Sequence, residues 1–330
     1  MKIYITLDYE LFFGPQNGTV QQCMITPTAE LLKILDPLGV KLTLFVDAGF
    51  IHALEQEKDK YPELANDYAL LEQQLKSMAQ NGHGIALHIH PHWEDTNYAP
   101  DKGWQMNTKR YRMNHFSADE ALAITTKYSE ALERISGIPQ RAYRAGGWSV
   151  QPIAQYSQAL LARGVKIDSS VFPQGYYDSD QQQYDFRAVA PFSGSYKFSE
   201  RVDAVDANGE FTEVPISSMK VMPWFFWKFL AVKFKKSPIH KAFGDGAAIA
   251  MTKANAIRLL TRPSYSVVSM DGFKASLLPA IYKKYSKKST IENPLDFVIL
   301  GHPKAFSRYS LERMKEFVSL THSKDEYATF

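Results

Sequence analysis

The chain has 330 residues, and 45% of them are hydrophobic, which is enough for one large α/β domain or for two average domains. Its formal net charge is only +3, and charges of both signs are mixed along the chain, so nucleic-acid binding is not expected. The single cysteine, Cys23, excludes an internal disulfide and any cysteine-rich zinc motif.

The N-terminal stretch predicts a buried strand at residues 3–7, which are mostly β-branched and aromatic. Acidic residues occur too early for the apolar core of a signal peptide, and no window is long and apolar enough to cross a bilayer, so we expect a cytoplasmic location. The strand leads into Asp8 and Glu10. On an extended chain these two carboxylates project to the same side and could share a metal or divide between ligand and base. Alternatively, Asp8 caps a turn and Glu10 is solvated.

The next elements alternate between helix and strand. Residues 27–38 have a helical apolar pattern opened by Thr26 as a cap, and residues 40–46 form the next strand. A second amphipathic helix at 64–80 ends at Asn81-Gly82, a favourable C-terminal signal. This β-α-β alternation predicts a parallel sheet.

Residues 82–93 hold four of the nine histidines, the densest set of metal-ligand candidates in the chain. They are His83, His88, His90 and His92. Residues 84–88 are small and apolar like a buried strand, and Pro91 cannot continue a central strand, so the histidines lie where strand becomes loop. In a parallel sheet this is the edge where active sites form. Because imidazole is a common ligand of divalent metals, the stretch predicts a metal site; a histidine-rich surface loop and backbone-bonded core histidines are the alternatives.

The middle of the chain adds two more polar side chains to predicted strands. Residues 94–115 predict a long loop whose aromatic residues could stack on sugar faces, and residues 117–136 predict a helix. Arg144 then ends a short strand before a Gly-Gly turn, and a helix is expected at 150–163. Asp168 lies within the apolar strand 165–171, where a buried carboxylate needs a partner.

The later part of the chain is less regular. Residues 202–213 could form a hairpin, and residues 214–216 a short strand. Residues 224–236 predict an aromatic helix with basic residues toward its end. This helix could lie on an anionic membrane surface near a lipid-linked glycan, although packing on the domain or at a dimer interface is the favoured interpretation. The strand 295–300 then precedes His302.

Five ordered motifs resemble those of the polysaccharide deacetylase family, the NodB-homology domains of carbohydrate esterase family 4, of the type found in surface-polysaccharide loci. They are Leu7-Asp8-Tyr9-Glu10, His88-Ile89-His90-Pro91-His92, Tyr143-Arg144-Ala145-Gly146-Gly147-Trp148, Ile167-Asp168-Ser169-Ser170 and Val298-Ile299-Leu300-Gly301-His302-Pro303. Each falls at a predicted strand end, and the stretch between the fourth and fifth lies outside the resemblance. The resemblance implies one α/β domain over residues 1–330, a distorted (β/α)7-type barrel, with an inserted subdomain at about residues 176–250.

The resemblance also implies a metal site. His88 and His92 would bind a divalent metal, with zinc as the expected ion, together with a carboxylate of the first motif. The family has two adjacent Asp residues in that motif, whereas Tyr9 follows Asp8 here. We therefore expect Asp8 to be the general base and Glu10 to be the third ligand, although Asp8 could bind the metal itself.

The remaining roles implied by the resemblance concern proton transfer. His302 would be the general acid, Asp168 would hold its other ring nitrogen, and Arg144 would orient the base carboxylate. His83 and His90 match no fixed role and are expected to be structural or supporting residues.

The implied enzyme is a hydrolase of carbon–nitrogen bonds that removes N-acetyl or O-acetyl groups from a sugar of a surface polysaccharide or its precursor. Its expected partners are the acetylated sugar or polysaccharide and, at the periphery, a membrane or lipid-linked glycan; the oligomeric state is left open. One alternative is a binuclear amidohydrolase-like enzyme that uses His88 and His90, which would require further histidine ligands. Another is a catalytically inactive carbohydrate-binding relic, which the Tyr9 substitution keeps open.

Overall fold

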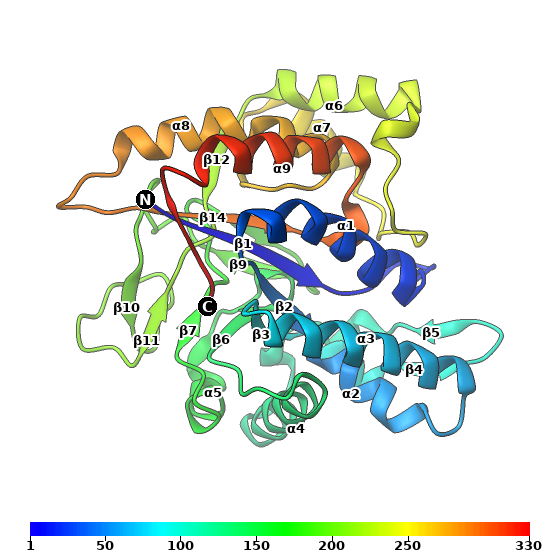
Figure 1. The fold of residues 1–330 in the computed structure, drawn as a ribbon. Helices are drawn as coiled ribbons and strands as arrows, with labels where there is room; N and C mark the ends of the chain where they lie inside the picture. The colour runs from blue at the N-terminus through cyan, green and yellow to red at the C-terminus, as the bar shows by residue number, and fades with distance from the viewer.

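A curled, mostly parallel sheet forms the centre of the computed structural model, which describes all residues from 1 to 330 (Figure 1). Its strand order is β10-β11-β7-β6-β3-β2-β1-β14, with β15 paired to the beginning of β1. Only β10 and β11 are antiparallel. The strands are β1 (Lys2–Tyr9), β2 (Thr43–Asp47), β3 (Gly84–Ile89), β6 (Ala142–Ala145), β7 (Ile167–Asp168), β10 (Tyr196–Phe198), β11 (Phe211–Glu213), β14 (Asp296–Gly301) and β15 (Glu326–Ala328).

Backbone hydrogen bonds outside these strands close the gap between β11 and β14. The N–H of Ile216 donates to the carbonyl of Val171 at 2.8 Å, and the N–H of Ser217 donates to the carbonyl of Val298 at 3.1 Å. The N–H of Val268 donates to the carbonyl of Ser217 at 2.7 Å. Residues 214–217 and the residues after β13 (Ser264–Val267) thus continue the wall to β14. The predicted α/β fold with a distorted barrel is confirmed.

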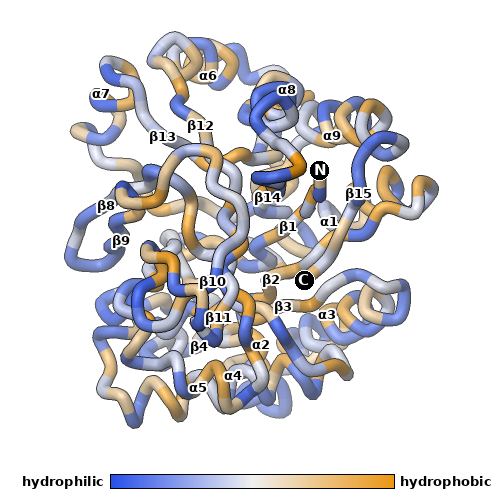
Figure 2. Tube along the Cα trace, turned by 90° about the vertical axis from the view of Figure 1, so that its left-hand side faces the viewer, coloured by the Kyte–Doolittle hydropathy of each residue, from blue (hydrophilic) through white to orange (hydrophobic).

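Helices cover the outside of this barrel, and α6 lies furthest from the sheet, beyond α8 and α9 (Figure 1). Their bounds are α1 (Thr26–Leu35), α2 (Ala48–Glu57), α3 (Pro62–Gln80), α4 (Ala118–Ser136), α5 (Ser157–Ala162), α6 (Pro223–Lys235), α7 (Lys253–Thr261), α8 (Leu278–Lys288) and α9 (Arg308–Thr321). None of them has the length and apolarity that a bilayer-spanning helix needs. A contiguous core of 69 buried hydrophobic residues fills the space between helices and sheet, where the traces of β1, β2 and β3 are largely apolar (Figure 2).

Three separate two-stranded antiparallel sheets lie outside the central sheet. They pair β4 (Asn97–Ala99) with β5 (Gly103–Gln105), β8 (Tyr176–Asp178) with β9 (Gln183–Asp185), and β12 (Ser218–Val221) with β13. The predicted insertion at 176–250 includes β8, β9 and α6, but it also includes β10, β11 and the wall segment 214–217. One side of the barrel is therefore built by residues that the sequence places in the insertion. The bounds of the insertion stay a prediction.

The strands predicted at 3–7, 40–46, 84–88 and 295–300 are confirmed as β1, β2, β3 and β14, with shifted ends. Two local predictions are wrong. Thr26 caps no helix, because α1 continues directly from a π-helical turn at Gln21–Ile25. Residues 150–163 contain only the short helix α5, because Pro152 cannot extend a helix and a 3₁₀ turn at Ile153–Gln155 follows it. The structure also adds α2, which the pattern did not predict.

Candidate metal and catalytic site

The carboxyl ends of four strands of the central sheet bring most of the predicted site residues together. Asp8 lies near the end of β1 and Glu10 just beyond it; His88 is on β3, Arg144 is on β6, and His302 follows β14. The register places His88 beside Arg144. Since parallel strands end at one edge of the sheet, residues from distant parts of the chain converge there. The main chain and side chains around them exclude most solvent: Glu10 is 5% exposed and His88 is 1% exposed.

Glu10, His88 and His90 form a compact group of donor atoms. The Oε2 atom of Glu10 lies 3.2 Å from Nε2 of His88 and 2.8 Å from Nε2 of His90. The two Nε2 atoms are 3.0 Å apart. In a tetrahedral zinc site with bonds of about 2.0–2.1 Å, ligand atoms are about 3.3 Å from one another. The triangle of donor atoms therefore has nearly the size that one metal ion requires.

The protonation of this group also fits a cation. Nδ1 of His88 lies 2.8 Å from the carbonyl oxygen of Arg144 and donates its proton there, so Nε2 faces the Glu10 carboxylate. Burial would lower the pKa of His88, but Asp8 and Glu10 raise it, so the site favours a positive charge at Nε2. Nδ1 of His90 is buried and has no hydrogen-bond partner. Two acceptors facing each other at 3.2 Å repel unless a proton or a metal lies between them. The donor set of two imidazoles and one carboxylate suits zinc and related divalent ions.

The charges around Glu10 keep it ionised. Burial would raise the pKa of Glu10, but the Lys304 ammonium and the two imidazoles outweigh it and hold that pKa well below its usual range. Burial lowers the pKa of His90 to about 4, despite the opposing effect of Glu10. His90 is therefore a neutral imidazole near neutral pH, which is the form that binds metals.

His92, the second histidine ligand expected from the resemblance, lies beside this group and not in it. Its ring is stacked on Tyr111 at 5.4 Å between centroids, with an interplanar angle of 13°. Both of its ring nitrogens are buried without a partner. On an extended chain residues i and i+2 share a face, so His88 points with His90, whereas His92 falls in the 3₁₀ turn Pro91–Asp95. A metal-binding role for His92 stays a prediction, and the structure brings His90 to the ligand position.

Gly146 makes room for His90. A Cβ atom at this position would lie 2.5 Å from Nδ1 of His90 and 2.7 Å from the carbonyl oxygen of Ile89. Both distances are shorter than atoms in contact allow. The Gly-Gly turn that follows Arg144 thus permits the close approach of two strand ends.

Asp8 and Arg144 form a second, separate charged unit. Nη1 of Arg144 donates to Oδ1 of Asp8 at 2.5 Å, and Nε donates to the carbonyl oxygen of Ser169 at 2.7 Å. Nη2 donates to the side-chain oxygens of Thr6 and Ser169, each at 3.1 Å. The guanidinium also covers the ring of Phe45 at 3.9 Å. Arg144 is fully buried and contacts one oxygen of Asp8, and the orienting role that the resemblance implies for it stays a prediction.

His302 takes its partner from Asp271, which the sequence did not single out. Nδ1 of His302 lies 2.8 Å from Oδ2 of Asp271, and the backbone N–H of His302 donates to Oδ1 at 2.7 Å. Nε2 then faces Oδ2 of Asp8 at 3.7 Å. Burial would lower the pKa of His302, but Asp271 and the site carboxylates raise it. His302 is thus oriented and favoured as an acid.

Asp168, expected to hold His302, contacts other residues. It accepts hydrogen bonds from the hydroxyl of Ser170 at 2.7 Å and from its backbone N–H at 3.3 Å. It lies in register with Glu213 of the neighbouring strand β11. Burial, and next the charge of Asp168, raise the pKa of Glu213 well above its usual range. The protonated form of Glu213 is therefore favoured, and Asp168 acts in the wall of the barrel.

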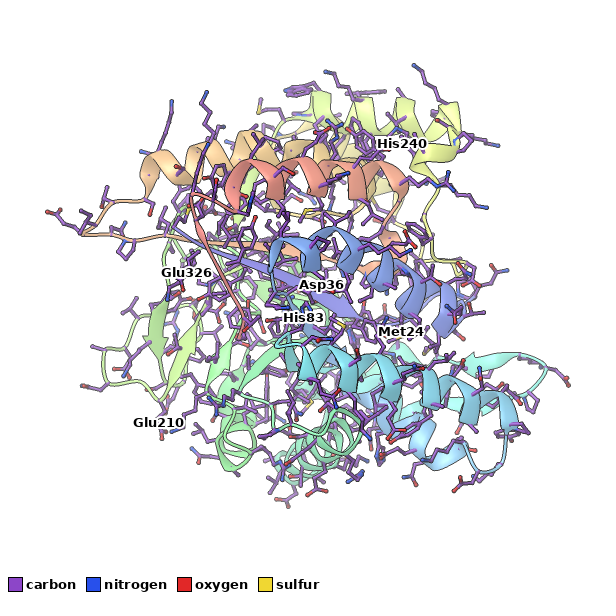
Figure 3. All side chains as sticks on the ribbon, in the orientation of Figure 1. Met24, Asp36, His83, Glu210, His240 and Glu326 are labelled. Carbon is purple, nitrogen blue, oxygen red and sulfur yellow. The ribbon has the colours of Figure 1, made fainter.

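Lys304 is the other residue that the sequence analysis missed. Its Nζ donates to Oε1 of Glu10 at 2.9 Å and to the carbonyl oxygen of Leu11 at 2.5 Å. It lies two residues after His302 in the turn Pro303–Ala305. A lysine directly after the last motif was the available signal. His83, by contrast, lies before the amino end of β3, where its Nδ1 accepts from the backbone N–H of Leu42 and its Nε2 lies 3.2 Å from Oδ1 of Asp36 (Figure 3).

A groove of about 540 Å³ opens beside the site. Tyr111, whose ring stacks on His92, is part of its wall, and so is Trp148 from the end of the Arg144 motif. Its other side chains include Tyr177, Tyr184, Gln182 and Arg258. Aromatic faces combined with amide and guanidinium groups suit the apolar faces and the hydroxyls of sugars.

No protein-family model matches the chain, and none of the curated proteins matches it. Among solved structures, a candidate polysaccharide deacetylase of Mycobacterium smegmatis is 18% identical, with 99% of this chain and 85% of that chain covered and a TM-score of 0.47. A polysaccharide deacetylase of Bacillus cereus is 13% identical, with 99% and 91% covered and a TM-score of 0.40. A 4-α-glucanotransferase of Thermococcus litoralis is 10% identical, with 100% and 37% covered and a TM-score of 0.46. These scores are all below 0.5 and do not separate the two activities, so the interpretation of function depends on the site itself.

Proposed function

We propose that the protein is a metal-dependent deacetylase that hydrolyses N-acetyl, or O-acetyl, groups on a sugar of a surface polysaccharide or its precursor. The observation that carries the proposal is the pairing of two buried units at one edge of the barrel. One is the donor triangle of Glu10, His88 and His90. The other is Asp8, held by Arg144 and facing His302.

The donor triangle is suited to one divalent ion, and zinc is the metal proposed for it. A metal held there would polarise the acetyl carbonyl and lower the pKa of an attacking water. Lys304 keeps the Glu10 carboxylate charged and fixed, and the Arg144 carbonyl fixes the tautomer of His88. The chain contains no second group of three such ligands within 4.8 Å of one another, so a binuclear centre is not favoured.

The second unit supplies proton transfer. Arg144 occupies Oδ1 of Asp8, which leaves Oδ2 free to accept a proton from water. The Asp271 carboxylate holds Nδ1 of His302, so the dissociable proton on Nε2 faces the reaction space and can pass to the leaving amine. The acetyl amide is a poor electrophile and its amine is a poor leaving group, so the reaction needs both a base and an acid. Oδ2 of Asp8 and Nε2 of His302, the proposed base and acid, lie 3.7 Å apart across the site.

The metal site is tested by elemental analysis of the purified protein after dialysis against a weak chelator. We expect about one equivalent of a divalent metal. The metal should be lost in His88→Ala and His90→Ala and kept in His92→Ala, which serves as the matched control. Metal loss in His92→Ala with retention in His90→Ala would instead support the ligand set implied by the resemblance, and metal-free wild-type protein that cannot be reconstituted would refute the site.

The reaction is tested by acetate release from acetylated amino-sugar oligomers and from O-acetylated sugars. Release that depends on the metal and on Asp8 would support the proposal. Tight sugar binding by the metal-loaded protein without acetate release would identify a binding relic instead.

A further inference from the structure

The small net charge of the chain hides a strongly uneven distribution. Residues 214–290 contain fourteen Lys and Arg but only two Asp and Glu. The rest of the chain contains 24 Lys and Arg and 33 Asp and Glu. The basic segment includes α6, α7 and α8, which lie together at one end of the molecule (Figure 1 and Figure 2). We call the surface formed by these three helices the basic face.

The cations of the basic segment have no acidic partner within the protein, although Nη1 of Arg258 donates to the hydroxyl of Ser264 at 3.1 Å. Thirteen of the fourteen are exposed, and none of the fourteen forms an ion pair. Elsewhere, helix lysines such as Lys33 and Lys76 pair with an acid one turn earlier. On α8 the pattern is reversed, because Lys283 and Lys287 are like charges at i and i+4. Such spacing is unfavourable in isolation, so the face is suited to an external anion.

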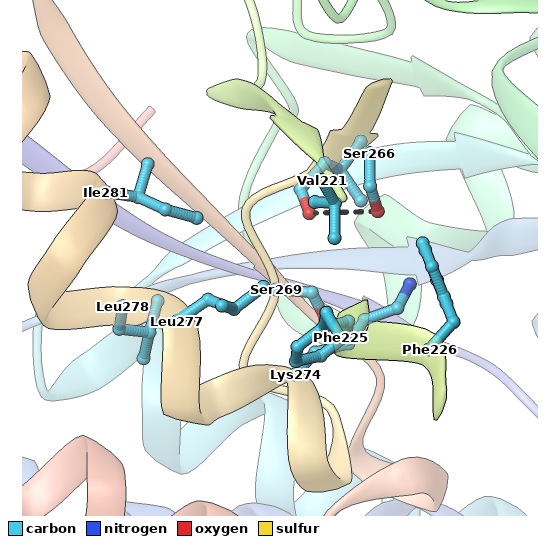
Figure 4. Close-up of a pocket in the computed structure, with 10 residues that line it drawn as sticks. Val221, Phe225, Phe226, Ser266, Ser269, Lys274, Leu277, Leu278 and Ile281 are labelled. Carbon is cyan, nitrogen blue, oxygen red and sulfur yellow. Dashed lines mark hydrogen bonds between the residues drawn. The ribbon is translucent and has the colours of Figure 1, made fainter. Parts of the chain in front are cut away.

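Helix α6 is anchored on one side and presents large apolar residues on the other. Phe225 is buried, and Phe226 lines a small cavity with Leu278 and Ile281 of α8 (Figure 4). At 100° per residue, Trp224, Trp227 and Phe234 lie within an arc of about 80° on the outer side. They are 55%, 56% and 74% exposed. Exposed aromatic rings therefore lie among unpaired lysines on a helix that the fold holds in place.

We propose that the basic face docks on an anionic membrane surface, with the outer aromatic rings of α6 at the boundary between headgroups and acyl chains and the lysines on lipid phosphates. Lysines alone would suit any polyanion, but the aromatic residues beside them favour a surface with an apolar layer beneath the charge. Lys228 illustrates the pairing, because its Nζ lies 4.8 Å from the ring of Trp224. The inference does not depend on the proposed reaction.

The experiment is co-sedimentation of the full-length protein with vesicles of phosphatidylcholine alone and of phosphatidylcholine mixed with phosphatidylglycerol. We expect binding to the anionic vesicles only, weakened by salt. The charge variant K228E/K235E/K236E and the aromatic variant W224S/F234S should each bind at least about tenfold more weakly. Trp227 is left unchanged because its indole N–H donates to the carbonyl of Leu260 at 3.0 Å.

The matched control is K102E/K166E/K197E, which reverses three exposed lysines outside the basic face that form no ion pair. It should bind anionic vesicles as the wild type does, and circular dichroism checks that all variants are folded. Equal binding to neutral vesicles, unchanged binding of the two α6 variants, or no vesicle binding at all would each overturn the proposal. Loss of vesicle binding in competition with duplex DNA, together with tight DNA binding that W224S/F234S does not weaken, would assign the face to nucleic acid instead.

Discussion

The buried site and the basic face handle charge in opposite ways. In the site, Asp8 is paired with Arg144 and Glu10 with Lys304, and all four are at most 8% exposed. In the basic segment 214–290, which includes the basic face, none of the fourteen cations forms an ion pair. Buried charges cost free energy unless the protein supplies their partners, whereas exposed charges are solvated by water. The pairing in the site therefore reflects preorganisation by the fold, and the unpaired face is complementary to something outside the protein.

The largest expected effect is on activity, and it differs between the two carboxylates of the site, Asp8 and Glu10. Asp8→Asn should lower kcat/KM by about 10²–10⁴-fold, because the base is lost, and should leave the metal content unchanged. Glu10→Gln should lose the metal as well as the activity. Steady-state kinetics and metal analysis of the two near-isosteric variants check this. Metal loss in Asp8→Asn would show that Asp8 is the ligand.

Removing the cation of a buried pair should destabilise the fold strongly. Arg144→Met leaves the Asp8 carboxylate buried without its partner, so we expect the free energy of unfolding to fall by about 3–5 kcal/mol. The double variant Asp8→Asn/Arg144→Met should lose less than the sum of the two single variants, since neither charge remains. Urea denaturation measures all three. Strict additivity would show that the pair is not coupled.

Variants of Asp271 and Asp168 test which of the two carboxylates orients His302. Asp271→Asn should lower kcat/KM by about 10²-fold, because His302 loses the carboxylate that fixes its tautomer and supports its charged form. Asp168→Asn should change kcat/KM much less, since Asp168 contacts Ser170. The kinetics are compared at equal metal loading. The reverse ranking would restore the role that the resemblance implied for Asp168.

The raised pKa of the buried Glu213 carboxyl predicts a pH dependence of stability. The pKa of Glu213 is raised in the folded protein, so the folded state keeps a proton that the unfolded state releases above its ordinary pKa of about 4.5. Wild-type stability should therefore fall as pH rises above that value, by at most about 1.4 kcal/mol per pH unit for this group. Glu213→Gln removes this loss, so its stability relative to wild type should increase with pH. Urea denaturation from about pH 5 to about pH 8 tests the sign, and parallel profiles would contradict it.

The smallest effect is expected on the basic face. Replacing Lys283 and Lys287 of α8 by Gln should change the free energy of unfolding by no more than about 0.5 kcal/mol, toward greater stability if at all, because it removes a like-charge pair. Thermal denaturation at low and high salt measures it. A loss of more than about 1 kcal/mol would mean that these lysines have partners within the fold.

The sequence predicted those parts of the molecule that depend on local patterns. Apolar β-branched runs located β1, β3 and β14, and polar residues at their ends located Asp8, Glu10, His88 and His302. The choice between His90 and His92 depends on where β3 ends. Pro91 ends the extended chain, so the i, i+2 rule that was applied to Asp8 and Glu10 would have paired His88 with His90. Asp271 was beyond prediction because its meeting with His302 depends on how residues after β13 close the barrel. Local sequence patterns therefore predict where strands end, whereas the contacts between those ends depend on how the barrel closes.

The contact between Lys304 and Glu10 joins residues 294 positions apart. During synthesis on the ribosome, Glu10, His88 and His90 emerge long before Lys304, which lies in the turn after β14. Until β14 pairs with β1, the nascent chain holds a carboxylate and two imidazoles without the Lys304 ammonium, and contacts between residues so distant in sequence form late and slowly. The charge balance around Glu10 is thus completed by one of the last long-range contacts of the fold to form.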